Sequence, residues 1–122
     1  MDQPAPLTPL EKTVLRQFAL HLGAEAQEAD AWVNALRAEK REYTGVGFYV
    51  DLAASPPIPA KLPLPPSPLK GVSGNLNAEG HPVGFLLYLQ NGQATCLECH
   101  QWAPFCWPSE ISSFEVGPDP LC

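Results

Sequence analysis

The chain has no basic residue after Lys70. All seven Lys and Arg residues lie at or before that position, residues 71–122 carry only acidic charges, and the formal net charge is −6 at pH 7. Proteins that bind nucleic acids or anionic membrane surfaces use clustered basic side chains to neutralise phosphates. The sequence therefore argues against both kinds of partner. Its acidic part suits a basic protein partner, or it serves only to keep the protein dispersed in water.

Long apolar runs are also missing. No stretch approaches the roughly 18 apolar residues of a membrane-spanning helix. The N-terminus, MDQPAPLTPLEKTVLRQ, lacks the apolar core of an export signal. We therefore expect a cytoplasmic protein whose cysteines stay as thiols, because that compartment is reducing. The four cysteines are Cys96, Cys99, Cys106 and Cys122.

A length of 122 residues, 13.2 kDa, suits one domain with its own core. We predict an α+β fold, in which two N-terminal helices pack on a mainly antiparallel sheet of four to five strands. The first helix is predicted over about residues 8–22, because Thr8, Pro9 and Glu11 form a capping box and apolar residues then recur every fourth position. The second is predicted over about residues 24–40, where acidic residues come first and basic residues last.

Strands are predicted where apolar and polar residues alternate. The predicted strands cover about residues 43–52, 70–76, 82–90, 93–99 and 111–116. Seven prolines in residues 54–70 predict an exposed, extended connection, because proline cannot donate to a β-ladder. Gly45 and Gly47 each leave a gap on the first predicted strand, which indicates a bulge or a close approach by a helix.

The Asn-Gly pair at residues 91–92 predicts a hairpin with a type I′ turn. Counting back from this turn places Leu87 opposite Cys96 and Phe85 opposite Glu98. Glu98 is then the one carboxylate inside the hairpin, on the same face as Cys96. If that face is buried, Glu98 needs a partner and becomes a candidate site residue, whereas at a sheet edge it would lie in water.

Residues 96–100 read Cys-Leu-Glu-Cys-His, which is the spacing of a c-type haem attachment site. The hairpin argues against haem, because Cys96 and Cys99 would point to opposite faces of one strand. The usual sixth ligand is missing too, since the only methionine is Met1. We therefore predict no haem and no other cofactor.

A metal or thiol site is the next interpretation of this segment. Cys99, His100 and Cys106 could converge if residues 100–106 loop back. One C-x-x-C without a second half is a weak signal, however, and small buried thiols explain it equally well. A redox centre would need a strand-to-helix turn that lowers a thiol pKa, and the sequence does not predict one. We therefore predict no metal ligand.

Other candidate groups are scattered along the chain. The histidines are His21, His81 and His100, and no nucleophile-elbow, P-loop or H-E-x-x-H motif is present. The aromatic residues Trp102, Phe105 and Trp107, with Phe114 nearby, could form a recognition surface, but core packing explains them better. No catalytic residue is predicted, and we expect a protein that is not an enzyme.

Three segments resemble a family of small uncharacterised bacterial proteins. They read TGVGFYVDL (residues 44–52), HPVGFLLYLQNGQATCLE (residues 81–98) and WPSEI (residues 107–111). The family pattern has a T-G-x-G-F strand, a G-F-x-L hairpin, an L-E-G-Y segment and a W-P motif. It carries Gly and Tyr where this chain has Cys99 and His100, so C-x-x-C-H is a feature of this chain alone. The resemblance implies a fold and no activity.

We therefore expect a non-catalytic protein-binding module, for example an acidic, immunity-type antagonist that covers a basic partner. The alternative is a metal- or thiol-dependent protein that uses Cys99, His100 and Cys106. A third hypothesis, an enzyme with carboxylate chemistry at Glu98, lacks a second carboxylate to pair with it. The sequence indicates neither the identity of a partner nor an oligomeric state.

Overall fold

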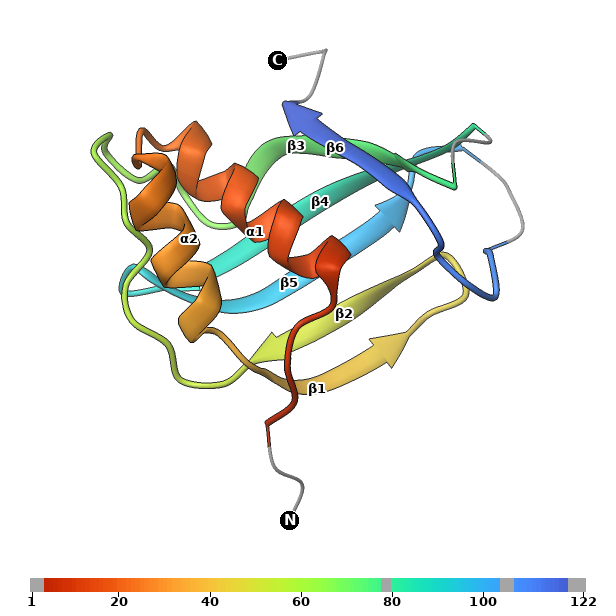
Figure 1. Ribbon diagram of the computed structural model, residues 1–122, viewed down its shortest axis with the longest axis horizontal. Coiled ribbons are helices and arrows are strands. Elements are labelled where there is room, and N and C mark those ends of the chain that lie inside the picture. Colours follow the sequence, from red (N-terminus) through yellow and green to blue (C-terminus); the bar gives the residue numbers. More distant parts are fainter. Residues whose placement is uncertain (1–3, 78–79, 104–106, 119–122) are drawn as a thin grey trace.

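The computed structural model describes residues 4–77, 80–103 and 107–118. Two helices lie on one face of a six-stranded antiparallel sheet (Figure 1), so the α+β class is confirmed and the predicted four to five strands are too few. The helices are α1 (Pro9–His21) and α2 (Ala26–Ala35), and the strands are β1 (Ala38–Tyr43), β2 (Gly47–Leu52), β3 (Leu69–Leu76), β4 (His81–Gln90), β5 (Gln93–Gln101) and β6 (Phe114–Pro118). Their order across the sheet is β1-β2-β5-β4-β3-β6.

Helix α1 begins and ends where its capping residues require. The Thr8 hydroxyl accepts from the Glu11 amide at 3.2 Å, and the Glu11 carboxylate accepts from the Thr8 amide at 2.9 Å, which confirms the capping box. After the last turn, Gly23 has a φ of +90°, a left-handed conformation that glycine adopts without strain. The buried side of the helix carries Leu10, Val14, Leu15 and Phe18.

The second helix is shorter than predicted, because residues 38–40 belong to a strand. Helix α2 ends at Ala35, Leu36 is extended (ψ 149°), and β1 then pairs antiparallel with β2. A β-strand at the edge of a sheet tolerates charged residues on both faces, so this one lacks the apolar alternation that predicts strands. The predicted strand 43–52 is therefore wrong in extent. Strand β1 ends at Tyr43, a turn follows at Gly45 (φ +87°), and only β2, Gly47–Leu52, continues the predicted strand.

Gly47 marks a close approach, but of a strand and not of a helix. A Cβ atom on Gly47 would overlap the carbonyl oxygen of Cys99 on the neighbouring strand β5. The two backbones are in contact there, so only glycine fits.

The hairpin of β4 and β5 is confirmed, but its predicted register is wrong by one residue beyond the turn. Asn91 and Gly92 have φ values of +54° and +78°, as a type I′ turn requires. Gln90 pairs with Gln93 and Leu89 with Ala94, and the register then shifts so that Tyr88, not Leu87, lies opposite Cys96. A β-bulge at Thr95 accounts for the shift, because it adds one unpaired residue to β5. Glu98 consequently pairs with Leu86 instead of Phe85.

The last strand begins three residues later than predicted, at Phe114, because Asn77 holds the residues before it in a loop. The Asn77 side-chain oxygen accepts from the amides of Ser112 and Ser113, and its side-chain nitrogen donates to the Glu110 carbonyl. Strand β6 then pairs with β3 at the edge of the sheet.

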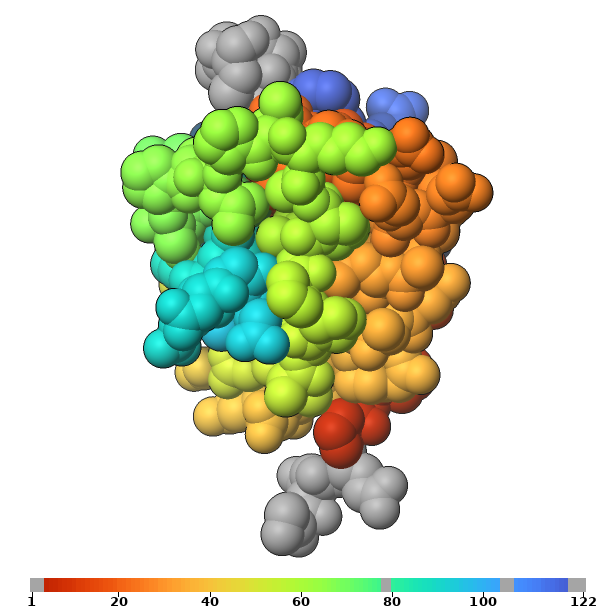
Figure 2. All heavy atoms as spheres, turned by 90° about the vertical axis from the view of Figure 1, so that its left-hand side faces the viewer, coloured from red at the N-terminus to blue at the C-terminus, as the bar shows by residue number. Residues whose placement is uncertain are grey.

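The proline-rich connection runs along one end of the helix–sheet sandwich. In Figure 2 this segment, coloured yellow-green, lies between the orange helices and the cyan turn of the β4–β5 hairpin. Most of it is exposed, as predicted, but Ser55 and Ile58 are buried. The Ile58 amide donates to the Gly92 carbonyl at 2.9 Å, which attaches the connection to the hairpin.

One hydrophobic core fills the space between the helices and the sheet. Its largest fully buried side chains come from both layers and include Phe18, Leu15, Phe85, Leu87 and Leu97. Neither helix among the described residues is long and apolar enough to cross a membrane.

Candidate functional site

The face of the sheet that carries no helix displays polar and aromatic side chains. We call it the helix-free face. Strand pairing places its side chains in cross-strand rows, because residues that pair across strands share a face. Lys40, Asp51, Cys96 and Tyr88 form one row, Glu42, Tyr49, Glu98 and Leu86 the next, and Gly47, His100, Gly84 and Ser73 a third.

Glu98 lies at the centre of this face, because β5 is an inner strand between β2 and β4. Only 16% of its side chain is exposed. The Tyr88 hydroxyl donates to one carboxylate oxygen, Oε1, at 2.9 Å. The other oxygen, Oε2, lies 3.9 Å from Nδ1 of His100, and Tyr49 is the cross-strand neighbour of Glu98 on β2. We call Tyr49, Tyr88, Glu98 and His100 the Glu98 cluster.

The ion pairs of the described residues give Glu98 no Lys or Arg partner. Its negative charge therefore acts on its neighbours. The charge of Glu98 raises the pKa of Tyr49, and the hydrogen bond to Glu98 together with burial raises the pKa of Tyr88 to about 12. Both phenols thus stay protonated at neutral pH, and Tyr88 acts as a hydrogen-bond donor to the carboxylate.

Cys96 lies on the same face as the Glu98 cluster and is half-buried. Burial raises the pKa of its thiol to about 11, and the nearby carboxylates of Asp51 and Glu98 add to the effect. A reactive cysteine requires the opposite shift, because the thiolate is the nucleophile. The surroundings of Cys96 therefore suppress its reactivity.

Trp102 extends the helix-free face beyond His100. A Cβ atom on Gly84 would overlap the indole nitrogen of Trp102, so the indole ring lies directly over this glycine. Trp102 as a residue is 43% exposed. A hollow of about 340 Å³ lies beside it, and Asn75 and Glu115 contribute to its wall. Trp102 is thus an exposed surface aromatic, contrary to the prediction of core packing.

Trp107, in contrast, packs as predicted. Its ring meets Phe48 edge to face with ring centroids 6.3 Å apart, and it contacts the core together with Phe114. Phe105, the remaining member of the predicted aromatic group, lies outside the described residues.

Of the three residues in the alternative metal or thiol hypothesis, Cys99 and His100 are described, and they point away from each other. Cys99 points into the core and is 2% exposed, whereas its neighbour His100 points to the helix-free face, because adjacent strand residues face opposite ways. Burial raises the pKa of the Cys99 thiol. Cys106 lies outside the described residues. Cys96 and Cys99 point to opposite faces of the sheet, as the sequence predicts. Cys96 shares the helix-free face with Glu98, whereas Cys99 pairs with the core residues Phe48 and Phe85. The described part of the chain has no group of three or more His, Cys, Asp or Glu side chains arranged to hold a metal ion.

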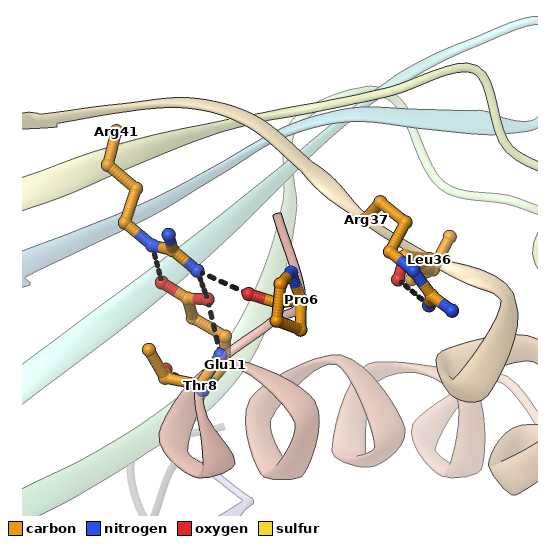
Figure 3. Close-up of polar contacts among 6 residues, drawn as sticks. All are labelled: Pro6, Thr8, Glu11, Leu36, Arg37 and Arg41. Atoms are coloured by element: carbon orange, nitrogen blue, oxygen red, sulfur yellow. Dashed lines mark hydrogen bonds and ion pairs between the residues drawn. The ribbon is translucent and has the colours of Figure 1, made fainter. Parts of the chain in front are cut away.

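A buried ion pair, which the sequence did not predict, lies at the start of α1 (Figure 3). Glu11, 2% exposed, binds the guanidinium group of Arg41 on β1 through both carboxylate oxygens, at 2.7 and 2.8 Å. Arg41 also donates to the Pro6 carbonyl at 3.0 Å. The pair joins the N-terminal segment, the first helix and the edge strand, and its role is structural. It leaves no free charge for a ligand.

An apolar pocket lies next to this ion pair. It has a volume of about 770 Å³ and lies between the start of α1, the turn before β2 and residues 107–112. Its walls are mainly apolar and include Leu10, Tyr43 and Phe48. Ligand pockets usually carry a few convergent polar groups that orient the ligand. The carboxylate of Glu11 is occupied by Arg41, so the pocket indicates no particular ligand chemistry.

The remaining histidines do not join the Glu98 cluster. His21 ends α1 and lies against Gly71 on the helix side of the sheet, and His81 begins β4. Of the cluster, the sequence singled out Glu98 but left its face open and placed it opposite Phe85 instead of Leu86. Tyr49 was not predicted, because β2 and β5 are far apart in the chain. Comparisons of the chain with protein-family models, with curated proteins and with solved structures give no match.

Proposed function

We propose that the protein is a non-catalytic binding module that recognises a basic protein through its helix-free face. The observation that carries this proposal is the separation of charge between the two sides of the sheet. Among the residues that strand pairing places on the helix-free face, four are acidic and one is basic: Glu42, Asp51, Glu98, Glu115 and Lys40.

The basic residues on the other side are largely used within the protein. Arg16 pairs with Asp30 at 2.6 Å, Lys61 pairs with Glu25 at 3.0 Å, and both pairs involve the helices. Arg41 is bound to the buried Glu11. The helix side is therefore close to neutral, whereas the paired residues of the helix-free face carry more acidic than basic side chains. Such a field attracts and orients a basic surface before contact.

The aromatic residues of the face suit protein recognition. Tyr49 and Trp102 are 37% and 43% exposed, and they flank the half-buried Tyr88 and His100. Tyrosine and tryptophan contribute strongly to protein interfaces, because they bury a large area and lose little conformational entropy. Acidic residues interleaved with such rings match a partner surface rich in Lys and Arg.

A catalytic role has less support from the same residues. Nucleophilic catalysis requires an activated side chain with a lowered pKa or an adjacent base. The two candidates nearest Glu98 have pKa values shifted the other way, to about 11 for Cys96 and about 12 for Tyr88. These shifts favour a binding function over nucleophilic chemistry.

A capture experiment with matched charge variants tests the proposal. The immobilised protein is incubated with a lysate of its host at about 50 mM and at about 500 mM NaCl, because screening weakens interactions between surface charges. The test variant is Glu42→Gln/Asp51→Asn on the helix-free face. The control is Glu28→Gln/Asp30→Asn on α2, which removes the same charge from the helix side.

The proposal predicts that the wild type and the control retain a stoichiometric protein of net positive charge at low salt, and that the helix-free-face variant and high salt release it. Chemical cross-links from that protein should fall on β2 and β5. Equal retention by both variants contradicts the proposal, and so does the absence of any stoichiometric partner at low salt.

A further inference from the structure

We propose that the Glu98 cluster is the receptor for one arginine side chain of the partner. This inference rests on the proposed function and names the group that the face recognises. It starts from a carboxylate that lies largely buried without a cationic partner. Burying a charge is unfavourable unless a counter-charge or several hydrogen bonds compensate it.

Glu98 has no Lys or Arg partner among the described residues. The Tyr88 hydroxyl donates to Oε1 at 2.9 Å, Oε2 lies 3.9 Å from Nδ1 of His100, and Tyr49 interacts with the same carboxylate from the other side. Nδ1 of His100 is itself buried without a hydrogen-bond partner. The Glu11 carboxylate in the same protein shows the contrast, because it is bound on both oxygens by Arg41. Glu98 thus lacks what Glu11 has, a guanidinium group.

The neighbours of Glu98 supply the other half of such a receptor. Tyr49 lies beside it across the strands, and Tyr88 lies on its other side and holds Oε1. A guanidinium plane stacks on aromatic rings and donates in-plane hydrogen bonds to a carboxylate. The polar edge of the cation would then meet Oε2, and its flat surface would meet the ring of Tyr49.

Arginine fits this environment better than lysine. An ammonium group is strongly hydrated, and losing that water at a half-buried carboxylate is costly, whereas guanidinium is weakly hydrated and keeps its charge at every physiological pH. The planar guanidinium group also donates parallel hydrogen bonds to a carboxylate, which an ammonium group does not. We therefore expect the receptor to discriminate against lysine.

The test uses N-acetylarginine amide as the probe, with N-acetylcitrulline amide and N-acetyllysine amide for comparison. Binding is followed by NMR through the side-chain resonances of Tyr49, Tyr88, His100 and Trp102. One charge-assisted contact with ring stacking predicts a dissociation constant on the order of 10 mM. The citrulline probe, which has the same shape without the charge, should not bind measurably, and the lysine probe should bind more weakly than arginine.

Variants assign the binding to the cluster. Glu98→Gln should weaken arginine binding about tenfold, since a contact with a charged group is lost, and Glu28→Gln on α2 should leave it unchanged. Tyr49→Leu should weaken binding several-fold, and Tyr49→Phe should restore it, because the ring is kept. Dispersed amide spectra establish that each variant is folded.

The receptor is disproved if citrulline and arginine shift the same resonances equally, if Glu98→Gln binds as the wild type does, or if no resonance moves at about 100 mM arginine probe. Those results overturn the arginine receptor alone. The proposed function is retained if, in the capture experiment, the Glu42→Gln/Asp51→Asn variant no longer binds the basic partner that the wild type binds. Conversely, arginine binding at Glu98 without any charge-dependent partner retains the receptor and overturns the proposed function.

Discussion

Glu98 determines the chemistry of its surroundings because its charge has no opposite charge bound to it. The hydrogen bond from Tyr88 satisfies one oxygen, and the negative field spreads to Tyr49 and Cys96. Each of these neighbours is an acid, so a nearby negative charge makes its proton harder to remove. The two phenols are consequently protonated hydrogen-bond donors beside one anion.

The tyrosines provide a direct measurement of this field. Because folding raises the pKa of Tyr88 from an ordinary value of 10.0 to about 12, the unfolded chain loses this proton at lower pH than the folded protein does. The contribution of Tyr88 to stability is therefore full below pH 10 and is lost as the pH rises toward 12. We predict that Glu98→Gln shifts tyrosinate formation, followed by ultraviolet absorbance, to lower pH.

The matched control for this titration is Glu28→Gln, which removes an equal charge from α2 on the far side of the sheet. Its titration curve should overlay that of the wild type. If Glu98→Gln overlays the wild type as well, the carboxylate does not govern the phenols and the description of the cluster is wrong.

Secondary-structure elements in this protein are held in place by contacts between distant segments. Strand β1 lies at the edge of the sheet and is mostly polar. Its attachment to α1 depends on Arg41, which reaches Glu11 from the inward-facing side of the strand. Burial of Glu11 raises the free energy of any state in which the pair is broken.

We therefore predict that Glu11→Gln lowers the free energy of unfolding by about 3 kcal/mol, because the guanidinium group of Arg41 is left without its counter-charge. Urea denaturation followed by circular dichroism measures the change. The double variant Glu11→Leu/Arg41→Leu should recover part of the loss, since no unpaired charge remains. A Glu11→Gln protein as stable as the wild type would show that the ion pair does not hold β1.

Strands β2 and β5 can contact each other at Gly47 because glycine has no side chain. An alanine there would place Cβ on the Cys99 carbonyl oxygen, which belongs to rigid backbone. We predict that Gly47→Ala costs about 3 kcal/mol of unfolding free energy or more, because the strands must separate to accept it.

Gly45→Ala is the comparison for Gly47→Ala. Gly45 has a φ of +87° but open space around its Cα, so alanine meets only backbone strain, about 1 kcal/mol. Urea denaturation measures the free energy of unfolding of both variants. If Gly47→Ala and Gly45→Ala lower it equally, contact between the strands at Gly47 is not the cause of the destabilisation.

The molecule as a whole has one core shared by its two layers, with a charged face turned away from that core. Both helices and the inner strands contribute to the same hydrophobic cluster. The proline-rich connection is attached to α2 by Trp32, which donates to the Pro56 carbonyl at 3.2 Å. It is attached to the hairpin by the Ile58 amide, which donates to the Gly92 carbonyl. Loss of either layer would expose the apolar surface of the other.

We accordingly predict a single cooperative unfolding transition. Circular dichroism reports mainly on the helices, whereas tryptophan fluorescence reports on the buried Trp32 and on Trp102 across the sheet. The two signals should change at the same urea concentration, because small domains with one core unfold in one step. Two separated midpoints would show that the helices and the sheet unfold independently.

Local features of this protein follow from residues next to one another in the chain. The capping box at Thr8 and the left-handed residues 91–92 satisfy nearby backbone groups, so their structure is predictable without knowledge of the rest of the fold. The opposed directions of Cys96 and Cys99 follow from strand geometry alone.

Features that depend on which segments lie side by side required the three-dimensional arrangement. The bulge at Thr95 moved Tyr88 opposite Cys96, and pairing of β2 with β5 brought Tyr49 to Glu98. Lys40 was predicted to end a helix and instead lies, with Arg41, on an edge strand that carries no apolar alternation. Long-range contacts of this kind are chosen by the packing of the whole core, since the free energy of closing a loop varies only slowly with its length and favours no particular pair of strands.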